Sequence, residues 1–120
     1  MVLVDTSVWI RFLAGREPFA SQLDRLLEGD EVVGHAFVHG ELLSGDRGGR
    51  AKLLADYLAM SQAAVLPHED VVTFVHSRRI AGRGIGWIDA HLLASALVDG
   101  NRIWTADTNL ATLATELGVG

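Results

Sequence analysis

Cysteine is absent from the 120 residues of this chain, and lysine occurs only once, as Lys52. Without cysteine there is no disulfide framework, thiolate metal site or thiol nucleophile. Basic charge is also scarce: the net charge is −5, which disfavours nucleic-acid binding through a broad basic surface. No stretch approaches the roughly 18 apolar residues of a membrane span, and the start, Met-Val-Leu-Val-Asp, lacks the basic segment of a signal peptide. We therefore expect a cytoplasmic protein that does not enter a membrane.

Hydrophobic residues make up 49% of the chain, which is enough to build one buried core. We expect residues 1–120 to form a single domain in which short strands alternate with helices. The expected strands are residues 2–5, 31–34, 64–66 and 102–105. The expected helices are residues 6–13, 18–28, 36–44, 50–61, 69–81, 88–98 and 110–117. This alternation predicts an α/β fold with a parallel sheet and helices on both faces.

Four of the acidic residues differ in position from the solvated acids elsewhere. Asp5 ends the first expected strand and Asp107 follows the last one, whereas Glu41 and Asp89 lie on apolar faces of expected helices. If the first and last strands are neighbours, Asp5 and Asp107 emerge at one sheet edge, where ligands of α/β proteins bind. Taken singly, Asp5 can be only a helix N-cap and Asp107 only a turn residue. Taken together, the four acids favour a site.

Four carboxylates in one place repel one another, and a hard divalent cation relieves that repulsion. Mg²⁺ or Mn²⁺ is the natural choice for an oxygen-only ligand set, since no thiolate is present to favour zinc or copper. The acidic residues therefore predict a metal site at the carboxyl edge of the sheet.

Four segments together resemble a known family. They are Val-Leu-Val-Asp-Thr-Ser at residues 2–7, Gly-Glu-Leu-Leu at 40–43, Ile-Asp-Ala-His-Leu-Leu-Ala-Ser-Ala at 88–96 and Trp-Thr-Ala-Asp at 104–107. In this order they resemble the PIN domain, and in particular the short VapC toxins of bacterial toxin–antitoxin pairs. The resemblance covers essentially the whole chain. It implies a three-layer α/β/α domain with a central, mainly parallel sheet of four or five short strands.

The resemblance also implies an activity. The acidic quartet of the family falls on Asp5, Glu41, Asp89 and Asp107, which would bind Mg²⁺ or Mn²⁺ and carry catalysis. Supporting residues would be Thr6, Ser7, Thr105 and Asn109, the last at a position where many relatives carry a further acid. The implied reaction is hydrolysis of structured cellular RNA, such as tRNA or rRNA, to 5′-phosphate and 3′-hydroxyl ends.

Partners are implied as well. VapC toxins form homodimers and are neutralised by a small VapB-like antitoxin. The apolar helices at 6–13 and 18–28 are the expected antitoxin interface, with the residues Trp9, Phe12, Leu13, Leu23 and Leu27. A basic cluster just before Asp89 is the expected RNA contact, with the residues Arg78, Arg79 and Arg83.

Several other features favour ordinary structural roles. His35 and His39 have a zinc-compatible spacing but no evident third ligand. Residues 82–86 are glycine-rich, yet they follow a helix instead of a strand, so we expect a flexible turn and not a phosphate loop. Core packing is the default expectation for the three tryptophans.

Two rival interpretations remain. A phosphatase-like or receiver-like α/β domain also places an aspartate after the first strand, but such phosphatases have a second aspartate where this chain has Ser7. A PIN-like module that binds without catalysis is the other rival, and the complete set of four acids argues against it.

Overall fold

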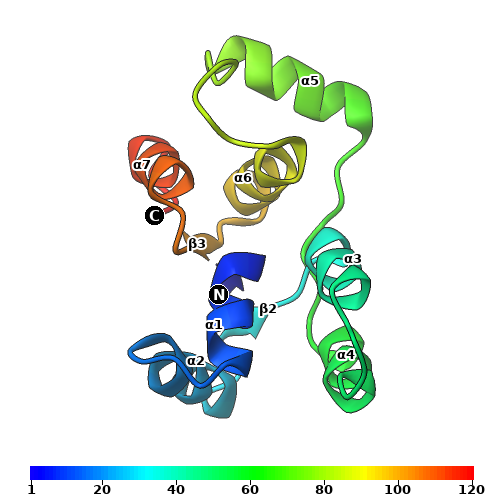
Figure 1. The fold of residues 1–120 in the computed structure, drawn as a ribbon. Coiled ribbons are helices and arrows are strands. Elements are labelled where there is room, and N and C mark those ends of the chain that lie inside the picture. The colour runs from blue at the N-terminus through cyan, green and yellow to red at the C-terminus, as the bar shows by residue number, and fades with distance from the viewer.

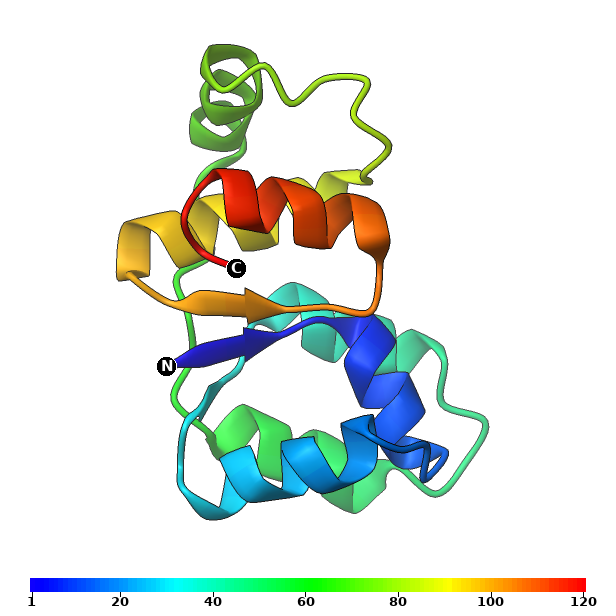
Figure 2. The same cartoon turned by 90° about the vertical axis from the view of Figure 1, so that its left-hand side faces the viewer.

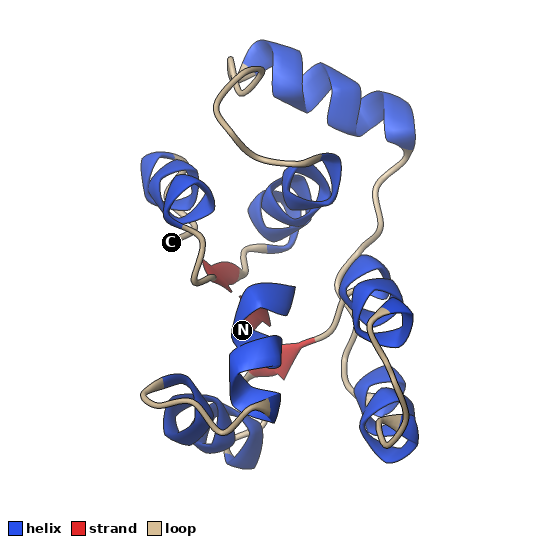
Figure 3. Cartoon of the chain, viewed as in Figure 1, coloured by secondary structure: helices blue, strands red, loops and turns tan.

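The computed structural model describes residues 1–120, and three short parallel strands lie at its centre among seven helices (Figure 1, Figure 3). The elements are β1 (Val2–Val4), α1 (Thr6–Leu13), α2 (Phe19–Glu28), β2 (Val32–Val33), α3 (Ala36–Ser44), α4 (Ala51–Ala59), α5 (His68–Ser77), α6 (Trp87–Asp99), β3 (Arg102–Trp104) and α7 (Thr108–Glu116). None of the helices has the length and apolarity required to cross a bilayer.

The strand order is β2-β1-β3, and both pairings are parallel. Leu3 of the central strand lies opposite Val33 on one side and Ile103 on the other, and all three are buried. In Figure 2, α6 and α7 lie above the strands, with α5 outside α6, whereas α1, α2 and α4 lie below the strands and α3 lies behind them. This arrangement confirms the predicted α/β/α fold, with three strands in place of four or five.

The expected strand at residues 64–66 does not form. Its pairing is displaced to the preceding residues, where Gln62 makes a single parallel bridge with Gly34. The backbone N–H of Ala64 donates to the Asp99 carboxylate at 3.0 Å, so this donor is not available to a strand ladder. Pro67 then supplies no N–H at all. The segment is therefore an extended connection and not a fourth strand.

The helix boundaries follow the capping chemistry of the sequence. Gly100 ends α6 with φ at 72°, a conformation that glycine adopts without strain. The expected helix at 69–81 is shorter in the structure, because α5 ends at Ser77 and Arg79 has φ at 55°. Arg78 and Arg79 therefore belong to the loop that leads into α6.

The main core joins the sheet to the helices through 21 buried residues. Trp9 of α1 packs edge-on against Tyr57 of α4, with ring centroids 5.5 Å apart. A separate small cluster of Val71, Ala90 and Ala94 lies between α5 and α6. Val71 is the only buried residue of α5, so this helix is weakly embedded in the domain.

His35 is a fully buried polar residue at the start of α3. Its Nδ1 accepts a hydrogen bond from the Phe37 N–H at 3.0 Å, so this nitrogen is unprotonated. The Tyr57 hydroxyl accepts from the His35 N–H at 2.8 Å. Burial, and after it the neighbouring His91, lowers the pKa of His35 to about 4. His35 is therefore a neutral capping residue of the core and not a metal ligand.

This burial predicts that acid weakens the fold. The folded-state pKa of His35 lies below its ordinary value, so protonation favours the unfolded chain. The stability provided by neutral His35 is complete above pH 6.5 and is lost as pH falls toward 4. A shift of this size corresponds to about 3 kcal/mol of unfolding free energy. Urea unfolding of wild type at about pH 7 and about pH 4.5 should reveal this loss.

The His35→Asn variant can keep the acceptor for the Phe37 N–H but cannot titrate, so its loss should be smaller by about that amount. His76→Asn, on the exposed surface of α5, serves as the control and should behave like wild type. Parallel pH dependences for wild type and His35→Asn would show that His35 does not carry the effect.

Candidate active site

The carboxyl ends of β1 and β3 and the first turns of α1, α6 and α7 gather at the same end of the molecule (Figure 2). This end is the edge of a parallel sheet at which ligands commonly bind. Asp5 follows β1, Asp107 precedes α7, and Asp89 lies in the first turn of α6. Glu41, in α3, is linked to this end through Thr6. The topology thus brings three of the four predicted acids to one edge and connects the fourth to it.

Asp5 is the most enclosed of the four acids, with 6% of its surface exposed. Its Oδ2 accepts two short hydrogen bonds, from the Ser7 hydroxyl at 2.7 Å and from the Thr105 hydroxyl at 2.8 Å. These hydroxyl oxygens in turn accept from the backbone N–H groups of Ala106 and Asp107, both at 3.0 Å. Asp5 occupies the N-cap position of α1, but its side chain makes no capping hydrogen bond and is fixed across the sheet edge instead.

The other three carboxylates are each held by one bond. Glu41 is exposed, and its Oε1 accepts from the Thr6 hydroxyl at 2.7 Å. Asp89 Oδ2 accepts from the Gly86 N–H at 3.2 Å. Asp107 Oδ1 accepts from the Leu110 N–H at 2.9 Å, so Asp107 does cap α7. In all four acids one oxygen is held by the protein, and the second oxygen has no hydrogen-bond partner within the chain.

The electrostatics link the four groups. The pKa of Asp89 is raised, first by burial and then by the negative charges of Asp5, Asp107 and Glu41, while the Gly86 N–H opposes the shift. These acids are thus close enough for Asp89 to sense the other three. Nevertheless, no three acidic or histidine side chains of the chain converge into a complete metal ligand set. Like charges favour such spacing.

The available donors fit a hard divalent cation. The free atoms are carboxylate oxygens, the ligand type preferred by Mg²⁺ and Mn²⁺. No imidazole joins them: His35 is capped within the core, and His91 is buried against Phe37 with ring centroids 4.7 Å apart. The chemistry of the site therefore supports an oxygen-ligated cation and not zinc.

Comparison with known proteins decides the family. Residues 2–116, nearly the whole chain, match the PIN domain. The chain belongs to the PIN-domain family. It is also 42% identical to ribonuclease VapC32 of Mycobacterium tuberculosis, in the strains CDC 1551 / Oshkosh and ATCC 25618 / H37Rv. The matches cover 99% of this chain and 94% of each relative. The predicted resemblance to a VapC-type ribonuclease with a PIN domain is thus confirmed at the level of the family.

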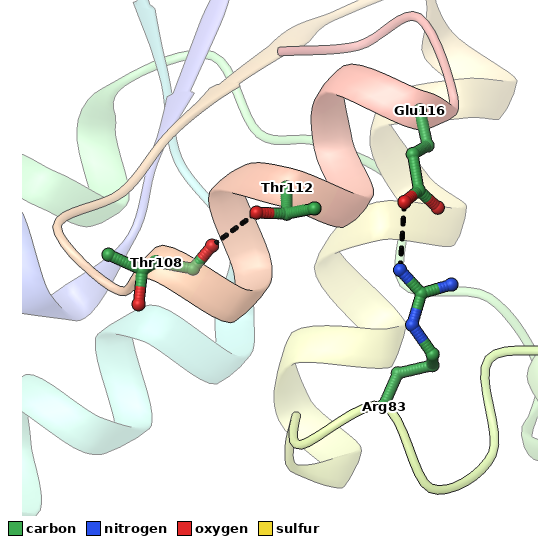
Figure 4. Close-up of polar contacts among 4 residues, drawn as sticks. All are labelled: Arg83, Thr108, Thr112 and Glu116. Carbon is green, nitrogen blue, oxygen red and sulfur yellow. Dashed lines mark hydrogen bonds and ion pairs between the residues drawn. The ribbon is translucent and has the colours of Figure 1, made fainter.

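Two predicted site residues of this PIN domain are placed differently from expectation. Asn109 donates from Nδ2 to the Gly84 carbonyl at 3.3 Å, which ties α7 to the glycine-rich loop. Arg83 makes an ion pair with Glu116 at 2.8 Å between the same loop and α7 (Figure 4). In α7 itself, the Thr112 hydroxyl donates to the Thr108 carbonyl at 2.9 Å (Figure 4). Asn109 and Arg83 therefore anchor the loop, which is not the free turn that its glycines predicted.

The tryptophans also depart partly from the expectation of core packing. Trp9 is buried and Trp104 stacks on Phe19, with centroids 6.1 Å apart. Trp87, however, is 41% exposed. The sequence pattern gives no signal of this exposure, because Trp87 directly precedes the apolar stripe of α6 and looks like part of it.

A cavity of about 310 Å³ opens between α1, α2, β2 and α4 in this PIN domain. Its lining residues are Trp9, Phe12, Leu27, Asp30, Val32, Leu53, Asp56, Tyr57 and Met60. We call this cavity the Trp9 groove. Among the predicted interface residues, Leu23 is fully buried in the core and cannot contact a partner, which corrects that prediction. Its helical spacing directs it toward the sheet and not outward.

The raised pKa of Asp89 predicts that its charge costs stability in the absence of metal. The cost is present at neutral pH and is lost as pH falls through the folded-state pKa. Without divalent cations, Asp89→Asn should therefore unfold at an equal or higher urea concentration than wild type at about pH 7. Added Mn²⁺ should stabilise wild type more than the variant. A variant that is less stable without metal yet equally stabilised by Mn²⁺ would contradict the assignment of Asp89 to the site.

Proposed function

We propose that this protein is a divalent-metal-dependent endoribonuclease whose active site consists of Asp5, Glu41, Asp89 and Asp107. The observation that carries the proposal is the hydrogen-bonding pattern that these four carboxylates have in common. Each has one oxygen positioned by the protein and one oxygen free, and Asp89 senses the charge of the other three. The similarity to ribonuclease VapC32 supports RNA as the substrate.

The chain supplies positioning and charge. Ser7 and Thr105 fix the orientation of Asp5, and Thr6 fixes that of Glu41. The free oxygens are the groups that would hold Mg²⁺ or Mn²⁺, and a bound cation supplies activation of water and stabilisation of the leaving oxygen. A carboxylate not used as a ligand can accept a proton from the attacking water. The reaction is hydrolysis of a phosphodiester bond that leaves a 5′-phosphate and a 3′-hydroxyl.

The substrate that we propose is structured cellular RNA, such as tRNA or rRNA, with Arg78 and Arg79 as phosphate contacts. Both arginines are exposed on the loop that precedes α6. Because the protein has few cations in total, this local pair of arginines would contribute a larger share of phosphate binding than it would on a basic protein.

Loss of one carboxylate should abolish cleavage without loss of fold. Purified wild type should cut total tRNA or rRNA in Mg²⁺ or Mn²⁺, and a chelator should stop it. Asp5→Asn should lower the rate by about 100-fold or more, because it removes charge from the centre of the site. Asp46→Asn, in the loop after α3, serves as the control and should cleave like wild type. Full activity of Asp5→Asn would refute the assignment, whereas inactivity of wild type toward all RNA would favour a binding module without catalysis.

The Trp9 groove is the proposed site of a VapB-like antitoxin. It combines apolar walls with two acidic side chains, Asp30 and Asp56. The apolar walls fit an apolar side chain of a bound peptide, and the two acids fit a basic residue beside it. The toxin would also be a homodimer, as in the family that the sequence resembles.

A single polar substitution at the groove should weaken antitoxin binding. Leu53 of α4 is half-buried and lines the groove, so Leu53→Gln removes apolar contact area from the interface. The affinity for the antitoxin encoded beside this gene should fall by about 10-fold or more, measured by calorimetry with the co-purified partner. Leu58→Gln lies on the same helix but outside the groove and serves as the matched control. Equal effects of the two variants would exclude the groove as the interface.

A further inference from the structure

Trp87 presents a large aromatic surface to solvent at the beginning of α6, two residues before Asp89. Its ring meets His91 edge-on, with centroids 5.1 Å apart and planes at 89°. The ring of His68, at the start of α5, has its centroid 5.1 Å from that of the Trp87 ring, and the two planes are tilted by 55°. These contacts hold the indole in a defined orientation while 41% of the residue remains exposed. An exposed aromatic ring that is held in this way is a preorganised stacking surface.

A small cavity adjoins this ring, with a volume of about 120 Å³. Its walls come from the end of α5, the following loop and the start of α6, and its lining residues are Val75, Ile80, Ala81, Gly82, Ile85, Gly86, Trp87 and Ala90. The cavity far exceeds the roughly 10–15 Å³ that one water needs. It is apolar on most sides and bordered by backbone at two glycines. Such a cavity suits one flat, partly polar ring.

The loop that forms this cavity also carries unpaired positive charge. Arg78 and Arg79 directly precede Ile80, and their exposed side chains make no hydrogen bond or ion pair. Five of the other eight basic residues of the chain are engaged. Arg11, Arg50 and Arg102 donate to backbone carbonyls, and Lys52 and Arg83 pair with carboxylates. Two adjacent free cations next to an apolar cavity match the phosphate and the base of a nucleotide.

We propose that Trp87 and the adjoining cavity bind one unpaired nucleobase of the substrate RNA, close to the scissile bond, while Arg78 and Arg79 contact its phosphates. This inference rests on the proposed ribonuclease function and deepens it. The position supports it, because Gly86 lines the cavity and also donates its N–H to Asp89. A base held here therefore fixes the strand against the helix turn that carries an active-site acid. Cleavage should then require an unstacked base near the cut, as is common in sequence-specific RNA recognition.

The test measures RNA binding in an Asp5→Asn background, which prevents cleavage in Mg²⁺. The probe is a fluorescein-labelled single-stranded RNA of about 12 nucleotides and mixed sequence, followed by anisotropy. Trp87→Ala should weaken binding by about 10-fold, and Trp87→Phe by much less, because a phenyl ring still stacks. Ala81→Leu, which fills the cavity from its exposed rim, should also weaken binding. The double variant Arg78→Ala/Arg79→Ala should have a shallower slope of log binding constant against log salt concentration. The decrease should correspond to the loss of up to about two phosphate contacts.

Two controls separate this proposal from others. Val98→Ala changes an exposed residue at the far end of α6 and should bind RNA like its parent. The same RNA annealed to its complement offers no free base, so Trp87→Ala should not alter its binding. Unchanged single-strand binding by Trp87→Ala and Ala81→Leu would overturn the proposal, even if wild type cleaves RNA. If Trp87→Ala instead turned a dimer into a monomer in light scattering and left RNA affinity unchanged, the surface would be a subunit interface and the proposal would fail.

Discussion

The site depends on one shared acceptor, the Oδ2 atom of Asp5. Two hydroxyls from different parts of the chain donate to it, Ser7 from α1 and Thr105 from the end of β3. The same hydroxyls accept from the N–H groups of Ala106 and Asp107. Hydrogen bonds to a charged acceptor are stronger than neutral ones, and here they join the ends of two parallel strands. The loop that carries Asp107 is thus fixed by the first acid of the site.

Four neighbouring carboxylates repel one another, and the fold gives them different exposure to solvent. Asp5 is nearly buried and has two hydroxyl donors, whereas Glu41 is exposed to solvent and has one. Asp89 lies between these extremes, and its raised pKa records both its burial and its negative neighbours. The four groups are spread far enough apart that none forms a complete ligand set with two others. A cation that drew them together would therefore contribute to stability as well as to chemistry.

The sequence predicted those features that depend on short-range pattern. Residues 2–4 are a continuous apolar run, and residues 102–104 place Ile103 and Trp104 after the exposed Arg102. Both segments form strands in a parallel sheet, which places Asp5 and Asp107 at one edge. Hydrogen bonds between residues far apart in the sequence could not be predicted. The N–H of Ala64 is taken by Asp99, 35 residues away, so no strand forms there. The exposure of Trp87 could not be predicted either, because Trp87 directly precedes the apolar stripe of α6. Likewise, Asn109 matches a family ligand position by spacing alone. Its side-chain amide instead donates a hydrogen bond to the Gly84 carbonyl.

The two apolar surfaces of the domain lie on opposite sides of the sheet. The Trp9 groove is formed by α1, α2, β2 and α4, whereas Trp87 and its cavity belong to α5 and α6 (Figure 1). A partner confined to the groove would leave the surface around Trp87 free, and RNA could still stack there. Inhibition by such a partner therefore requires a segment that continues from the groove past the carboxyl end of β1 toward the free carboxylate oxygens. Since these carboxylate oxygens are negatively charged and have no partner, a basic side chain on that segment would pair with them in place of the metal. Because the two surfaces are separate, a partner bound in the Trp9 groove can inhibit cleavage only by reaching the acidic edge.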